Sequence, residues 1–158
     1  MTTLDFQSAL GAEIAELLKN IQTEDVDGNK KSGIAIFDQQ LPEITEDEED
    51  SSQFFPYAIV RISDGKTEDD DTPWIVTADI LIGIHDRDKS GAGYKKVMEM
   101  CQKIVDRFSA EPLLDKKYRA LQNMEWALQD EDTYPFYFAG IRMQFYLPRV
   151  GRRDPFYG

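Results

Sequence analysis

The segment from residue 73 to residue 108 contains two periodicities of apolar residues, one directly after the other. From Trp74 to His85 apolar positions alternate with mixed ones, and this period of two predicts a strand with one wholly apolar face. Apolar residues then recur every three or four positions, which predicts a helix with a single apolar stripe. The stripe comprises Tyr94, Val97, Met98, Cys101, Ile104, Val105 and Phe108. We expect a long central strand with a helix lying across its sheet.

Similar patterns predict one more helix and four more strands. An apolar stripe from Phe6 to Ile21 predicts the helix, which a turn over residues 23–31 ends. Alternating residues predict strands over 32–41, 57–62, 118–128 and 136–147, the second of which ends at the turn tripeptide Ser63-Asp64-Gly65. The order helix, three strands, helix, two strands lacks the alternation of α/β proteins. We therefore expect an α+β fold, a mostly antiparallel sheet of about five strands with two main helices packed on it.

The length and charge of the chain narrow the possible functions. Its 158 residues are predicted to form one domain, residues 1–148, followed by a basic and aromatic C-terminal segment, residues 149–158. The 30 acidic and 18 basic residues give a formal net charge of -12. Because binding to phosphates depends on Lys and Arg, this balance argues against a protein that grips nucleic acid over a broad surface.

The cysteine content and the N-terminal pattern indicate the compartment. The single cysteine, Cys101, cannot form an intrachain disulfide, and its place in the apolar stripe predicts a buried, reduced thiol. The first residues lack the pattern of a signal peptide, and no apolar run reaches the roughly 18 residues that span a membrane. We expect a soluble protein, made in the cytoplasm and without a membrane partner.

Acidic runs at residues 46–50, 68–71 and 130–132 predict loops, because runs of like charge usually stay solvated. None of them has the oxygen-ligand spacing with a central glycine that a calcium loop requires. The C-terminal segment, with three arginines, would complement the acidic loops of a neighbouring molecule.

The only histidine, His85, lies at the end of the central strand and precedes Asp86 and Asp88. Such a group could bind a metal ion or act as a base with its orienting carboxylate. The alternative is a turn in which Asp88 or Ser90 caps the next helix and His85 faces solvent. We favour the turn, because a metal site usually needs further ligands at definite spacing and none is evident. The sequence therefore predicts no enzymatic activity and no cofactor.

Several aromatic residues gather at predicted loops and strand ends, where they could form a protein interface. They are Phe54, Phe55, Tyr57, Trp74, Tyr134, Phe136, Phe138, Phe156 and Tyr157.

Four stretches together resemble the tail terminator proteins of long-tailed, siphovirus-type phages and prophages of Gram-positive bacteria. They are Phe55-Pro56-Tyr57-Ala58-Ile59-Val60-Arg61 with Asp64-Gly65, the strand end Ile82-Gly83-Ile84-His85-Asp86, the helix start Gly91-x-Gly93-Tyr94, and Tyr134-Pro135-Phe136-Tyr137-Phe138-Ala139-Gly140. The likeness spans residues 4–148 and contains no catalytic residue; the C-terminal segment is not part of it.

The resemblance implies a small structural protein that forms a six-membered ring on the head-proximal end of the virion tail. Such a ring halts growth of the tail tube and docks the head completion or neck protein. DNA crosses it without specific binding, and an acidic lumen would let DNA slide. Its candidate contact residues are Glu46, Asp47, Glu48, Glu49, Asp50, Glu68, Asp69, Asp70, Asp71, His85, Asp86, Arg87, Asp88, Arg149, Arg152, Arg153, Phe156 and Tyr157.

Three alternatives stay open at this point. A neck or head-to-tail connector protein would have a similar shape. A small metal-dependent hydrolase would be centred on His85, Asp86 and Asp88. A bacterial adaptor domain would have no role in a phage.

Overall fold

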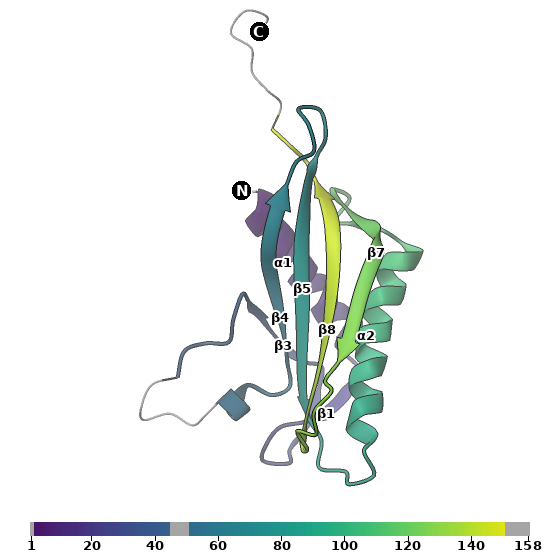
Figure 1. Ribbon diagram of the computed structural model, residues 1–158. Coiled ribbons are helices and arrows are strands. Elements are labelled where there is room, and N and C mark those ends of the chain that lie inside the picture. The colour runs from purple at the N-terminus through teal and green to yellow at the C-terminus, as the bar shows by residue number, and fades with distance from the viewer. Residues whose placement is uncertain (1, 45–50, 151–158) are drawn as a thin grey trace, which may run out of the picture.

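The computed structural model describes residues 2–44 and 51–150 (Figure 1). These residues form an α+β fold with helices α1 (Thr2–Leu18) and α2 (Ala92–Ala110) packed on a sheet, and a short 3-10 helix, η1 (Ser51–Phe54). The strands are β1 (Gln22–Glu24), β2 (Lys30–Ser32), β3 (Ala35–Asp38), β4 (Tyr57–Lys66), β5 (Trp74–His85), β6 (Leu113–Leu114), β7 (Tyr118–Leu128) and β8 (Phe136–Leu147). The described part of the sheet thus has eight strands, and the expectation of about five is wrong.

Four long strands form the centre of the sheet in the order β4-β5-β8-β7, and each pair is antiparallel. The short strands lie at its margins. Strand β1 pairs with the end of β5 and with β2. Strand β6 pairs with the start of β7, and β3 pairs in parallel with β4. Figure 1 shows both helices behind this sheet, on the same face.

The main core fills the space between the helices and one sheet face. Alternate residues of β5 from Val76 to Ile84 are at most 3% exposed, as the period of two predicts. The bounds of β5, β7 and β8 are also those predicted from alternation. In α2 the buried stripe includes Met100, whereas Tyr94 is 47% exposed and Met98 half-buried, so the predicted stripe was partly wrong.

Short strands account for the other differences. The predicted turn at 23–31 lies within the hairpin of β1 and β2. The tip of this hairpin is closed by Asp25 Oδ1, which accepts hydrogen bonds from the backbone N–H of Asp27 (3.0 Å) and Asn29 (2.9 Å). Strands of three residues are too short to show a period. The tripeptide at 63–65 is not a turn but part of β4, where a bulge after Ile62 shifts the register.

A second apolar cluster covers one end of the opposite sheet face. Phe55, Tyr57 and Ile59 are its buried members, and the partly buried ones are Val26, Phe37, Leu41, Phe54, Leu81, Phe136 and Phe138. Most of the aromatic residues expected at an interface therefore pack against one another. Trp74 and Tyr134 remain exposed, at 42% and 43%. Phe156 and Tyr157 lie outside the described residues.

The two ends of the sheet carry different loops. At the His85 pole, residues 25–29, 85–91 and 129–136 meet. At the Arg149 pole lie residues 66–74 and 147–150, together with the start of α1, because Thr3 shares a pocket with Trp74. Figure 1 accordingly shows the start of α1 and the end of β8 at this second pole.

Candidate interaction surfaces

His85 is buried, not exposed to solvent as the predicted turn requires. It is 3% exposed, belongs to β5, and its ring packs against Phe136 with ring centres 5.3 Å apart. Its Nδ1 lies 3.2 Å from Glu24 Oε1, yet the described residues give this nitrogen no aligned hydrogen bond. Strand β5 continues through His85, which pairs with Glu24 of β1 and Phe136 of β8.

The three residues after His85 tie loops together. Asp86 is 8% exposed; its carboxylate accepts from the Asp88 N–H at 2.9 Å and lies 3.7 Å from Lys96 Nζ. The Asp88 carboxylate accepts from the Ser90 N–H, and this hydrogen bond lowers the pKa of Asp88. Helix α2 is instead capped by Gly91, without a side-chain bond, so the predicted cap by Asp88 or Ser90 is wrong.

Arg87 joins the β1–β2 turn to the β7–β8 loop. Its backbone N–H donates to Glu24 Oε1 at 2.9 Å, and its guanidinium donates to the carbonyl of Val26. Its carbonyl accepts from the Tyr134 hydroxyl at 2.6 Å. Within residues 2–44 and 51–150, no three His, Cys, Asp or Glu side chains converge to hold a metal ion. The contacts of residues 85–88 are thus those of a structural junction.

The acidic run at 68–71 forms the tip of the β4–β5 hairpin. The Asp69 carboxylate accepts from the N–H groups of Asp71 (2.8 Å) and Thr72 (3.0 Å). Arg149 donates to the carbonyls of Asp69 (2.5 Å) and Thr72 (3.3 Å). Glu68 and Asp70 belong to the same exposed tip. Arg149 therefore contacts an acidic loop of its own chain, through backbone oxygens.

The remaining candidate contact residues lie outside the described residues. They are Glu46, Asp47, Glu48, Glu49 and Asp50 of the first acidic run, and Arg152, Arg153, Phe156 and Tyr157 of the C-terminal segment.

A row of alternating charges, which sequence reasoning missed, crosses the sheet face opposite the helices. Arg61, Asp79, Arg142 and Glu125 stand opposite one another on β4, β5, β8 and β7. Arg142 binds Asp79 with two hydrogen bonds, of 2.8 and 3.3 Å, and this bonding raises the pKa of the guanidinium. Alternation predicts these strands, but only the strand pairing shows that the four charges align. We call this surface the polar face.

Both outer strands of the central sheet have an open stretch. On β4, β3 pairs with Tyr57–Val60, and the Gln39 side chain bonds the backbone N–H (2.6 Å) and carbonyl (3.3 Å) of Ile62. On β7, β6 pairs with residues 118–119, and the Ala120 N–H donates to the Pro112 carbonyl at 2.8 Å. No strand of the described chain pairs with the outer side of 63–66 or of 121–128.

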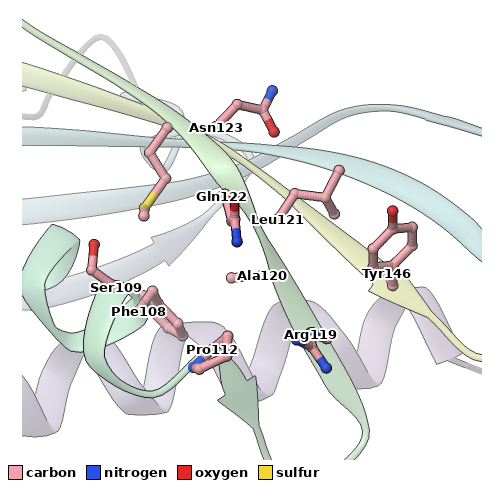
Figure 2. A pocket seen from close by; sticks show the side chains of 10 residues that line it. Phe108, Ser109, Pro112, Arg119, Ala120, Leu121, Gln122, Asn123 and Tyr146 are labelled. Carbon is pink, nitrogen blue, oxygen red and sulfur yellow. The ribbon is translucent and has the colours of Figure 1, made fainter.

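A pocket of about 710 Å³ lies where α2 ends beside β7 (Figure 2). Figure 2 shows Phe108 and Pro112 on one side of it, and β7 with Tyr146 on the other. The lining residues are Phe108, Ser109, Pro112, Arg119, Ala120, Leu121, Gln122, Asn123, Met124 and Tyr146. This set contains no carboxylate, histidine or cysteine, so it offers no acid–base pair for catalysis.

Trp126 lies on the same face of β7 as Tyr118 and Leu128, but it is 52% exposed because it stands on the edge strand.

No helix of the described residues is both long and apolar enough to cross a membrane. No protein-family model matches the chain, and no curated protein matches it by sequence.

Proposed function

We propose that the chain assembles head to tail into a ring that caps the head-proximal end of a phage tail tube, stops its growth and docks the head or neck protein. The observation that carries this proposal is the pair of open edges, on β4 and β7, at opposite sides of the four central strands. A cyclic ring needs two different surfaces that fit each other, since each contact joins one side of a subunit to the other side of the next.

The directions of the strands support such a ring. Four consecutive antiparallel strands make β4 and β7 run in opposite directions. Rotation about an axis along the sheet brings β7 of one copy against β4 of the next in antiparallel orientation, which is the pairing that the central strands already use. Open edges otherwise invite uncontrolled association, so a closed ring also removes a liability.

The resemblance to tail terminators supplies the place of this ring. Its stretches map onto β4, β5 and β8, onto the start of α2 and onto the second apolar cluster, so the likeness concerns the framework of the sheet. The partners we propose are further copies of the chain, the tail tube protein and a head completion or neck protein. With a charge of -12 per copy, the ring lets DNA pass without binding it.

The test is the distribution of tail lengths, measured by electron microscopy, in a lysate where this gene carries an early stop codon. We expect overlong tails, with or without heads, and normal particles when the intact gene is supplied in trans. Headless tails of normal length would point to the connector role. Normal-length tails on intact particles would reject the proposal and bring back the adaptor alternative.

A further inference from the structure

Trp126 is the exposed aromatic side chain of the open β7 edge. It stands opposite Ile141, a core residue that is 1% exposed, so it lies on the helix side of the sheet and is nevertheless 52% exposed. We propose that Trp126 of one copy fills a pocket beside Gly65 of the next copy, against the apolar side chains of Trp74 and Val76. This inference rests on the head-to-tail ring proposed above, and it identifies the contact that holds the ring together.

The pocket lies on the other open edge. It has a volume of about 270 Å³ and is lined by Thr3, Ile62, Ser63, Asp64, Gly65, Trp74 and Val76. Gly65 stands opposite Val76, so a side chain at Gly65 would point to the helix side. A Cβ atom there would lie 3.5 Å from Val76 Cγ2 and 3.7 Å from the Trp74 ring, so the missing side chain leaves an apolar hollow. An indole ring combines large apolar area with rigidity and suits such a site.

Pairing of β7 of one copy with β4 of the next brings Trp126 to the pocket beside Gly65. If Gly65 stands opposite Trp126 in an antiparallel pair, Lys66 stands opposite Glu125. Glu125 is on the polar face, since it stands opposite Arg142. Lys66 is on the same face, because it stands opposite Ile75, which alternates with the helix-side residue Val76. Opposite charges directly across an antiparallel pair stabilise it. A shift of one residue would pair Trp126 with a residue whose side chain lies on the polar face. The register with Gly65 opposite Trp126 therefore allows both the contact of the indole with the pocket and the charge pair of Lys66 with Glu125.

The same register avoids the occupied parts of both edges. Within one copy, Lys66 stands opposite Ile75, Ile75 opposite Tyr146, and Tyr146 opposite Arg119, so Lys66 is level with Arg119. Glu125 stands opposite Arg142, which is four residues from Tyr146 along β8. Without a stagger, β3 and Gln39 of one copy would meet the C-terminal half of β7 of its neighbour, and Pro112 of that neighbour would meet β4. A stagger of four residues, about 13 Å, brings residues 63–66 against the open stretch of β7.

Stagger also sets the angle between strands and ring axis. Four strands span about 19 Å across the sheet, so a stagger of about 13 Å per copy corresponds to a tilt of about 35°. Closed sheets have tilts of roughly 35–45°, because closure requires a stagger of this size. The contact argued from Trp126 and the two open edges is thus compatible with a closed ring.

Cross-linking tests the register directly. Chains carrying Lys66→Cys and chains carrying Glu125→Cys are mixed and oxidised with copper phenanthroline, both as purified full-length protein and in particles that contain both. We expect a disulfide-linked pair from the mixture and not from either chain alone. The matched control replaces Glu125→Cys by Arg119→Cys, the partner of Lys66 in an unstaggered contact. A link with position 119 and not 125, or no link in either sample, would overturn the proposal.

Substitution of the indole tests the pocket. Trp126→Ala should weaken self-association in sedimentation by about tenfold or more, since buried interface tryptophans commonly contribute that much. Tyr94→Ala, a 47% exposed aromatic of α2, is the matched control and should leave association unchanged. Equal association of both variants and the parent would overturn the proposal. A 66–125 link together with normal tails in the stop-codon lysate would retain this contact and reject the role on the phage tail.

Discussion

Gly83 shows how closely the second apolar cluster packs on the sheet. A Cβ atom at this position would lie 2.7 Å from Tyr57 Cζ and 2.9 Å from Phe55 Cε1, both aromatic rings of the cluster. Real Cβ atoms do not approach so closely, so a side chain would displace the rings. The stretch Ile82-Gly83-Ile84 that carries part of the resemblance is therefore explained by packing.

Gly83→Ala should lower the free energy of unfolding by about 1–3 kcal/mol, the usual effect of overpacking a core. Urea unfolding followed by fluorescence measures it. Gly140→Ala is the matched control, since a Cβ there has its nearest neighbour at 3.5 Å, in ordinary contact with Leu81. Equal midpoints for the two variants would show that the aromatic cluster is not packed as described.

His85 shows what a sequence cannot reveal at this scale. Its burial depends on Glu24 and Phe136, which lie far away in the chain, and no local pattern connects them. A histidine followed by Asp86 and Asp88 is usually a polar turn. The contacts of residues 85–88 join the β1–β2 turn to the β7–β8 loop, and their role in an interface stays a prediction.

Elements with many periods were predicted well, and short ones were not. Strands β5, β7 and β8 have 12, 11 and 12 residues, so alternation fixes both their face and their bounds. Strands β1, β2 and β6 have two or three residues and exist because neighbours pair with them. The open edges and the charge row depend on strand order, which periodicity does not contain.

Helix α2 places Cys101 in the core, where it is 3% exposed, and burial raises the pKa of its thiol to about 11 from an ordinary 9.0. At pH 8 the thiolate fraction is then about 100-fold below that of a free thiol, and the thiolate is the reactive form. We expect an aromatic disulfide reagent to label the native chain at least 100-fold more slowly than the urea-unfolded chain. Equal rates would mean that α2 separates readily from the sheet.

The same raised pKa predicts how stability depends on pH. Because the folded thiol holds its proton to higher pH than the unfolded one, its contribution is constant below about pH 9 and is lost as the pH rises toward 11. Cys101→Ala unfolding curves, measured between pH 8 and 11 beside the parent, should lack this part of the alkaline decline. An identical decline in both proteins would contradict it.

At the scale of the whole molecule, the C-terminal segment is predicted to serve assembly and not folding. Deleting residues 151–158 should change the melting temperature by less than about 2 °C while weakening self-association. Deleting residues 149–158 also removes the Arg149 bonds to Asp69 and Thr72, which are exposed and contribute little. Calorimetry and sedimentation check both variants. A large fall in melting temperature for the shorter deletion would make the segment part of the fold.

The position of Thr3 and Arg149 at the same pole has a practical consequence for imaging. A gold or fluorescent label attached before Thr2 or after Val150 would mark that pole from either end of the chain. In a ring of parallel copies, all such labels gather on a single rim. If the ring caps a phage tail as proposed, the side on which the labels lie would show which pole faces the capsid. An insertion between residues 25 and 29 would mark the other rim as an independent check.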